Sequence, residues 1–221
     1  MYYVDWLAPF NASVAHVGGS QKSLQEIRNG TYRDIDEFHN STTYWRATDR
    51  YAPLNVYTSF ERINALNKAK KYTTSSFTGF NRKDSDAAKN PNATNVTVNV
   101  SSAPYNSRYT YHSDSNTYRR SQGGSAHLDR EDGQISPRVV IAMMVNERTV
   151  LEDGWREQID AVGGGVAHIF QDGTHQEVEW EKKNRASQIR FITKDGKPVE
   201  LARGQTWITA VPKGKGSVSW Q

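Results

Sequence analysis

The sequence predicts an α+β fold, with a helix-rich first part followed by a mainly antiparallel β domain. In the first third of the chain, apolar residues recur every three to four positions, which is typical of the buried face of a helix. From residue 94 onward they alternate with polar residues, which indicates half-buried strands. The pairs Asp172-Gly173 and Asp195-Gly196 favour tight hairpin turns between such strands. We therefore expect an α/β piece over residues 1–72 and a β domain over residues 73–221.

The clearest helix pattern follows residue 58. Phe60, Ile63 and Leu66 recur at helical spacing. Thr58 has the type of an N-cap residue, and Glu61 stands three positions later, so the two side chains match a capping box. We expect this helix to pack on the rest of its domain through the face that carries the apolar residues.

The segment before this helix, residues 50–57, is unusually apolar for a connection. It contains Tyr51, Pro53, Leu54 and Val56, and Pro53 requires an extended residue before it. We expect this segment to be buried against the helix, because an apolar loop in water leaves its side chains solvated at a cost in free energy.

Earlier in the chain, glycines and capping residues mark the ends of short elements. Ser20 can cap a helix that ends at Asn29-Gly30. Ile35 and Phe38 are three apart, which fits a helical turn better than a strand. Inward-facing aromatic residues so close to the first residue indicate that part of the domain is missing upstream. The expected elements are an amphipathic helix (2–10), a strand (12–17), a helix (20–27) and a helical turn (32–39).

The β domain begins with a polar stretch that we expect to contain a mobile segment near residues 80–92, since few apolar side chains there can offset the entropy of ordering. The nearly continuous apolar run 139–145 predicts a central strand. The last residues, 213–221, are expected to be loosely held. The expected strands are residues 94–100, 107–112, 117–120, 139–145, 159–170, 177–180, 189–193, 199–201 and 207–211.

Composition excludes several classes of protein. The 221 residues include no cysteine, which excludes disulfides and thiolate metal sites. The net charge of +4 is spread evenly, with excesses of +2, +1 and +1 over residues 1–72, 73–137 and 138–221. A nucleic-acid binder concentrates positive charge on one face or arm, so nucleic acid is not an expected partner. No apolar run approaches the ~20 residues of a membrane span, and the first residues lack the pattern of a secretory signal.

Five short motifs, in this order, resemble the YerB-like family of bacterial lipoproteins over residues 2–212. These are AHVGGSQ, WRATDRYAPLNVYTS, YRRSQGGSAHLD, GGGVAHIFQDGT and GQTWITAVP. The family has two adjacent domains of unknown function behind a lipoprotein signal, and it carries a histidine where this chain has Leu54. The resemblance implies a location on the extracellular side of the bacterial cell membrane, with the lipid anchor on a segment upstream of this chain.

Neither a metal nor a cofactor is expected. The pairs His112/Asp114 and His127/Asp129 have i,i+2 spacing, which places both side chains on one face of a strand, but zinc requires three or four converging ligands. Gly163-Gly164-Gly165 lacks the pattern of a nucleotide-binding loop. Ser20 follows Gly-Gly at the start of a helix without the G-x-S-x-G pattern of a nucleophile elbow. An N-cap role or anion binding at the helix start remains open for it.

The candidate binding site lies around the Gly-Gly turn before the most apolar strand. Arg119 or Arg120 offers a planar fork for a carboxylate or phosphate, and Asp129 can orient His127. Because adjacent strand residues point to opposite faces, only one of the arginines can reach such a site. A salt-bridged loop is the alternative. The expected ligand-binding residues are Arg119, Arg120, His127, Asp129, Ser20, Tyr109 and Tyr111, the tyrosines as part of an aromatic-lined groove.

These observations favour a non-enzymatic binding or scaffold protein of the bacterial cell envelope, with a glycan or another protein as its partner. The alternative is a hydrolase of an envelope polymer, with or without assistance by a metal, that uses His127, Asp129 and His16.

Overall fold

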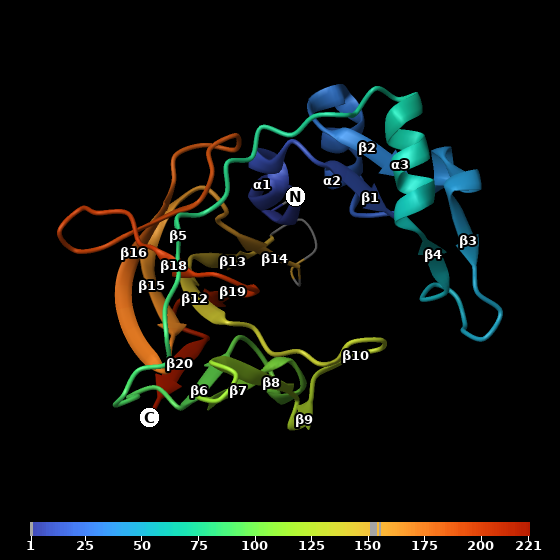
Figure 1. Cartoon of the computed structure of the whole chain (residues 1–221). Helices are drawn as coiled ribbons and strands as arrows, with labels where there is room; N and C mark the ends of the chain where they lie inside the picture. The colour runs from blue at the N-terminus through green and yellow to red at the C-terminus, as the bar shows by residue number, and fades with distance from the viewer. Residues whose placement is uncertain (1, 151–153, 155) are drawn as a thin grey trace. The chain divides into compact units, whose positions relative to one another are not determined.

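The computed structural model describes residues 2–150, 154 and 156–221, and the chain divides into two compact units (Figure 1). Unit 1 comprises Tyr3–Thr78 and Arg185–Gln188, whereas unit 2 comprises Gly79–Asn184 and Ile189–Gln221. Among the described residues, the α-helices lie in the first part of the chain, and the second part is built from strands with one 3₁₀ turn, Ala103–Tyr105. The predicted α+β fold class is thus confirmed, while the predicted division after residue 72 stays a prediction.

Unit 1 combines three short helices with two small sheets. Strands β1 and β2 pair in parallel, and strands β3 and β4 form an antiparallel hairpin. A π-helical turn, Ile27–Thr31, follows α2, and 3₁₀ turns follow α1 and β2. The elements are α1 (Tyr2–Leu7), β1 (Ser13–His16), α2 (Gln21–Glu26), β2 (Arg33–Asp36), β3 (Tyr44–Arg46), β4 (Val56–Thr58) and α3 (Phe60–Ala69).

Two local expectations in unit 1 are wrong. Only Glu37–His39 of the expected helical turn 32–39 form a 3₁₀ turn, whereas residues 33–36 form strand β2, because Ile35 pairs with Ala15 of β1 and is fully buried. The cap of α3 is Ser59, whose hydroxyl accepts from the Arg62 amide at 3.3 Å. The hydroxyl of Thr58 instead donates to the Thr43 carbonyl at 2.8 Å, which ties β4 to the turn before β3.

Residues 50–54 of the apolar segment that leads into α3 are exposed, which is also contrary to expectation, whereas Val56 and Tyr57 are half-buried in β4. The exposed residues lie in the loop of the β3–β4 hairpin, where Tyr51 is 94% exposed and Leu54 is 79% exposed. Phe60, which begins α3, is 85% exposed, and no residue of this helix is fully buried. The helix therefore covers unit 1 only through its half-buried residues, among them Ile63 and Leu66.

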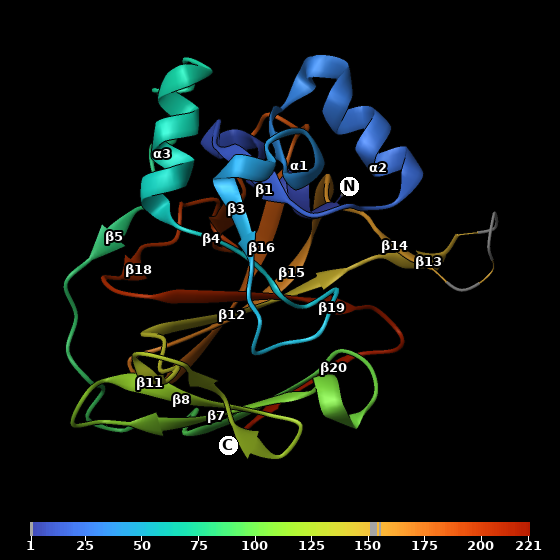
Figure 2. The same ribbon diagram turned by 90° about the vertical axis from the view of Figure 1, so that its right-hand side faces the viewer.

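Unit 2 contains two five-stranded sheets (Figure 2). The first has the order β17-β16-β15-β12-β19, in which β12 pairs antiparallel with β15 and parallel with β19. Its strands are β12 (Val139–Val145), β15 (Gly163–Gln171), β16 (Thr174–Lys182), β17 (Arg190–Ile192) and β19 (Thr206–Pro212). The second sheet has the order β20-β6-β7-β8-β9. Its strands are β6 (Asn95–Asn99), β7 (Ser107–His112), β8 (Thr117–Gln122), β9 (Ser125–Ala126) and β20 (Ser217–Trp220).

Shorter strand pairs complete unit 2. Strands β10 and β11 form a small hairpin beside β8, β13 pairs with β14, and β5 pairs in parallel with β18. Their bounds are β5 (Arg82–Lys83), β10 (Leu128–Asp129), β11 (Gly133–Gln134), β13 (Glu147–Thr149), β14 (Glu157–Ile159) and β18 (Leu201–Ala202).

The core of unit 2 lies between the two large sheets. Val96, Tyr109 and Tyr118 from the second sheet contact Val140 and Phe170 from the first, and all five are fully buried. This arrangement explains the alternating pattern of β6 and β7, since only every second side chain faces the opposite sheet.

The last residues of the chain are part of this architecture rather than loosely held. Strand β20 pairs with β6, and the Gln221 carbonyl accepts from the amides of Thr94 and Asn95 at 2.6 and 3.0 Å. The predicted loose tail is therefore wrong. The local sequence does not indicate this pairing, because the partner strand lies more than one hundred positions earlier in the chain.

The polar stretch before β6 also has backbone hydrogen bonds. The Ala88 amide donates to the Asp172 carbonyl at 3.0 Å, and the Ala93 amide donates to the Gly173 carbonyl at 2.9 Å. Mobility near residues 80–92 stays a prediction, which limited proteolysis can test. None of the helices in the described part of the chain combines the length and the apolarity that a membrane span requires.

Candidate functional site

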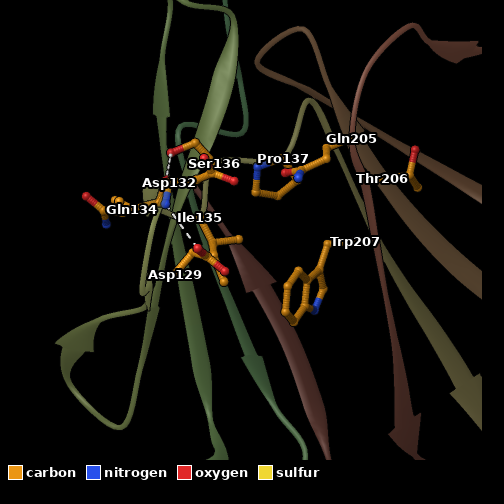
Figure 3. Close-up of a pocket in the computed structure, with 10 residues that line it drawn as sticks. Asp129, Asp132, Gln134, Ile135, Ser136, Pro137, Gln205, Thr206 and Trp207 are labelled. Carbon is orange, nitrogen blue, oxygen red and sulfur yellow. Dashed lines mark hydrogen bonds between the residues drawn. The ribbon is translucent and has the colours of Figure 1, made fainter. Parts of the chain in front are cut away.

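A pocket of about 430 Å³ opens in unit 2 next to β19 (Figure 3). Trp207 supplies its aromatic surface, and the remaining side chains offer carboxylates, amides and hydroxyls. In Figure 3, Asp129 and Ile135 lie on one side of the pocket, and Trp207 lies on the other. The lining residues are Asp129, Asp132, Gly133, Gln134, Ile135, Ser136, Pro137, Gln205, Thr206 and Trp207.

Two segments form the walls of this pocket. Trp207 stands on β19, in register with Val140 of the central strand β12, so the indole is attached to a rigid support. The opposite wall is the segment after β11, which runs back beside β8. There the amide of Arg120 donates to the Ile135 carbonyl, and the amide of Tyr118 donates to the Pro137 carbonyl, both at 2.9 Å. The pocket is therefore built on backbone pairing at both walls.

Trp207 contacts Arg120, a buried arginine that is only 4% exposed. Its guanidinium donates to the hydroxyls of Tyr109 at 3.2 Å and Ser107 at 2.6 Å, and to the Gln122 side-chain carbonyl at 2.8 Å. It also lies over the Trp207 ring, 4.2 Å from the centroid. No carboxylate pairs with Arg120 among the residues that the structure describes. Neutral acceptors and an aromatic face therefore hold this charge.

His127 belongs to the same cluster. Its Nδ1 faces an Nη1 donor of Arg120, so Nδ1 accepts and the ring proton of the neutral imidazole is on Nε2. Burial, together with the positive charge of Arg120, lowers the pKa of His127 below its ordinary value. The imidazole also meets the Trp207 ring edge-on, with 5.8 Å between the centroids. His127 is thus a neutral group that helps to hold Trp207 and Arg120 in place.

Asp129 is not the partner of His127, contrary to the expected pairing. Its Oδ1 accepts from the amides of Glu131 at 2.8 Å and Asp132 at 3.0 Å, which fixes the turn between β10 and β11. These two hydrogen bonds, the one from Asp132 first, hold the pKa of Asp129 below its ordinary value. Asp129 therefore enters the pocket as an ionised carboxylate at its rim.

The other expected site residues lie elsewhere. Arg119 is exposed on the face of β8 opposite Arg120, so one arginine alone reaches the cluster, as strand alternation requires. Tyr109 and Tyr111 are 0% and 8% exposed and belong to the core, which corrects the expectation that they line an accessible groove. Ser20 lies in unit 1, where it accepts from the Ser23 amide and caps α2.

The most prominent pocket residue, Trp207, was not among the residues expected from sequence. It stands in the strand 206–212, where the alternation with Thr206 and Ile208 favours an ordinary strand residue. The available signal was the Arg203-Gly204 turn directly before it, since binding residues gather where a strand leaves a turn. That signal does not distinguish Trp207 from the five other tryptophans of the chain.

His16, named for the hydrolase alternative, lies in unit 1, whereas His127 and Asp129 lie in unit 2. Its Nε2 is 2.8 Å from Asp34, and one oxygen of Asp36 lies within 4.8 Å of both. Asp36 already binds the Arg28 guanidinium at 2.6 Å. Burial by itself would raise the pKa of Asp36, but hydrogen bonds from Arg28, the Phe38 amide and His39 outweigh it and lower that pKa. We therefore interpret this cluster as a salt-bridge network.

A pair of histidines, His168 and His175, lies on the first sheet of unit 2. His168 Nδ1 is 3.0 Å from His175 Nε2, and the His175 ring stacks on Trp220 with 3.8 Å between the centroids. Burial lowers the pKa of both histidines. These rings pack against one another and against Trp220 of β20, so they lie on the face of the first sheet that meets the second sheet and do not line the pocket.

Comparisons with known proteins agree with this architecture. Residues 1–73 match the N-terminal domain, and residues 96–208 match the C-terminal domain, of the protein family of unknown function DUF3048. The chain is 28% identical over 218 residues to "Putative lipoprotein YerB" of Bacillus subtilis, and it covers 64% of that protein, which is less than two thirds of its length. The crystal structure of the YerB protein from Bacillus subtilis superimposes with a TM-score of 0.83 at 26% identity, over 99% of this chain and 74% of that one. On the strength of both domain matches, which together span most of its length, the chain belongs to the DUF3048 family.

Proposed function

We propose that this chain is a non-enzymatic binding module of the bacterial cell envelope and that the pocket beside Trp207 binds a glycan. The observation that carries the proposal is the half-buried indole of Trp207 in a pocket whose other side chains are mostly hydroxyls, amides and carboxylates. An aromatic face packs against the C–H face of a sugar ring, while amides and carboxylates accept from its hydroxyls.

The pocket has the size and stiffness that such a ligand needs. A volume of about 430 Å³ lies within the range of small-molecule sites. Arg120 and His127 hold Trp207 from behind, which limits the rotamer entropy that the indole loses on binding. Gln134 is fixed as well, because its side-chain Nε2 donates to the backbone carbonyl of Arg120 at 3.2 Å. These contacts support a preformed site.

The same contacts argue against the hydrolase alternative. A histidine that acts as a general base needs a free nitrogen and a group that orients the other one. In His127 the unprotonated Nδ1 is occupied by Arg120, and Asp129 is engaged by backbone amides. The arrangement of His127 and Asp129 therefore supports ligand binding better than it supports general-base catalysis.

The envelope location rests on the lipoprotein relative, whose name implies a membrane anchor. We extend that location to this chain, and to the extracellular side of the membrane, as part of the proposal. A pocket for a glycan suits that setting, since the polymers of the bacterial envelope are rich in sugars. Another protein of the envelope is the alternative partner.

Tryptophan fluorescence and calorimetric titration with soluble fragments of envelope polysaccharides test the proposal. The Trp207→Ala variant is expected to lose binding by tenfold or more, since burying a large apolar side chain is worth about 1.5–3 kcal/mol and about 1.4 kcal/mol is a factor of ten in affinity. Trp45→Ala, which removes a half-exposed tryptophan from unit 1, is the matched control and should bind as the parent chain does. Equal affinities of the two variants would show that the glycan site lies elsewhere.

A further inference from the structure

The loop of the β3–β4 hairpin in unit 1 exposes apolar side chains without a partner in that unit. Tyr51 is 94% and Leu54 is 79% exposed, and Ala52 and Pro53 between them are exposed as well. Single exposed apolar residues are ordinary, but four consecutive ones at the end of a hairpin form a local apolar tip. We call residues 51–54 the hairpin tip.

The hairpin tip is held by a turn that leads away from the rest of unit 1 (Figure 1). The Leu54 amide donates to the Tyr51 carbonyl at 3.1 Å, and the Ala47 amide donates to the Asn55 carbonyl at 2.7 Å below the turn. The tip therefore has a defined backbone.

Charged and amphipathic side chains lie directly behind the hairpin tip. Arg50 lies over the Tyr57 ring, 5.9 Å from its centroid, and makes no ion pair among the residues that the structure describes. Trp45 stacks on Tyr57 at 6.1 Å and carries Arg62 on its ring at 4.9 Å. The hairpin from residue 44 to residue 58 contains two arginines and a single carboxylate, that of Asp49. Arg46 pairs with Glu37 at 3.7 Å, so Arg50 is the arginine available beside the tip.

We propose that the hairpin tip inserts into the interfacial region of an anionic phospholipid bilayer. The order of the side chains from the tip matches the layers of a membrane surface. Tyr51 and Leu54 would enter the acyl boundary, Arg50 would meet lipid phosphates, and Trp45 and Tyr57 would lie at the level of the headgroups. This inference is independent of the glycan pocket, which lies in unit 2.

A bilayer fits the tip better than a protein partner does. Protein interfaces of measurable affinity bury a broad, shape-complementary patch with a central apolar core. The hairpin tip is a turn of four residues, far fewer than the roughly 20–30 residues that each side of such an interface contributes. A fluid lipid surface requires no complementary shape, and the positive charge of Arg50 complements anionic headgroups.

Flotation of the whole chain with vesicles tests the proposal. Vesicles of phosphatidylcholine alone and of phosphatidylcholine with phosphatidylglycerol are compared at low and high salt. The parent chain is expected to bind the anionic vesicles more tightly, and salt should weaken that preference. The double variant Tyr51→Ser/Leu54→Ser should lower the partition coefficient about tenfold or more, because it removes the burial of two apolar side chains.

Two matched controls separate insertion from general effects. Tyr105→Ser removes an exposed tyrosine of unit 2, and Arg119→Gln removes an exposed arginine there; both should bind as the parent does. Arg50→Gln should lose about fivefold on anionic vesicles alone, the effect of one cation near a charged surface. Equal thermal stability of the variants confirms that they fold. Failure of the parent chain to bind either vesicle, or undiminished binding of the double variant, overturns the proposal and leaves a protein as the occupant of the tip.

Discussion

The guanidinium of Arg120 lies against the face of the Trp207 indole, with its central carbon 4.2 Å from the ring centroid. The two residues come from different sheets of unit 2, since Arg120 is on β8 and Trp207 is on β19. Their contact joins the sheets at the edge where the pocket opens, and it makes the pocket wall dependent on a buried charge.

Arg120→Ala is expected to lower the free energy of unfolding by about 2–4 kcal/mol. The substitution leaves the Ser107, Tyr109 and Gln122 side chains without their donor and removes the support of Trp207. Arg119→Ala, on the exposed face of the same strand, should change the free energy of unfolding by no more than about 0.5 kcal/mol. Urea denaturation of both variants measures the difference, and similar values would mean that the buried arginine contributes little to stability.

Stability should fall as the pH drops below about 6.5, the ordinary pKa of histidine. Burial lowers the pKa of His168 and of His175 in the folded chain, with the charge of His168 as a second cause for His175. The unfolded chain therefore binds more protons in this window, so protonation favours unfolding, and the stability that the neutral pair provides at higher pH is lost.

Thermal melts between pH 8 and pH 5 measure this dependence. A double variant, His168→Gln/His175→Gln, should show a shallower decline than the parent chain. His112→Gln, which changes a histidine outside the pair, serves as the control and should keep the parental slope. If the double variant keeps that slope as well, groups other than this pair dominate the acid side of the stability curve.

Gly173→Ala is expected to destabilise the chain far more than Gly196→Ala. Both glycines have left-handed backbones, with φ of 77° and 80°, so both substitutions introduce similar strain. A Cβ at position 173 would lie 2.6 Å from Tyr111 and 2.8 Å from Pro91, whereas nothing lies within 4 Å of one at position 196. The crowding should add about 1–3 kcal/mol to the cost at position 173. Melting in urea checks the difference, and equal losses would contradict the packing of Pro91 on this turn.

Ser59→Ala should cost about 1 kcal/mol, because Ser59 caps α3 through the Arg62 amide. Thr58→Ala should cost about as much for another reason, since it removes the hydrogen bond to the Thr43 carbonyl. Helicity by circular dichroism distinguishes the two, because only the Ser59 variant should fray the start of α3. Fraying in the Thr58 variant alone would restore Thr58 as the cap.

Local patterns in the sequence predict much of unit 2. The alternation of Val96 and Val98 identifies β6, and the apolar run of residues 139–145 matches β12 over its whole length. Both signals are local, since they depend only on which faces of a strand are buried. The turn at Asp172-Gly173 likewise joins β15 to β16 as its sequence indicates.

Features that depend on distant partners were not predictable in this way. Strand β2 forms because β1 lies beside it, and β20 forms because β6 lies beside it. The site shows the same limit. Strand alternation indicates that one arginine of the pair 119/120 faces inward, but which one is decided by pairing with Tyr109 across the sheet. Trp207 enters the site only through the parallel pairing of β19 with β12.

The return of the chain to unit 1 at Arg185 limits how this protein can be divided by genetic engineering. Arg185 lies 2.9 Å from Asp5 and 2.8 Å from Glu26, so a residue far along the chain ties α1 to α2 in the first unit. A fragment cut at the boundary between the two matched domains would lack this arginine, so Asp5 and Glu26 would lose their ion-pair partner. A chimera that takes unit 1 from one relative and unit 2 from another should therefore take residues 185–188 together with residues 3–78.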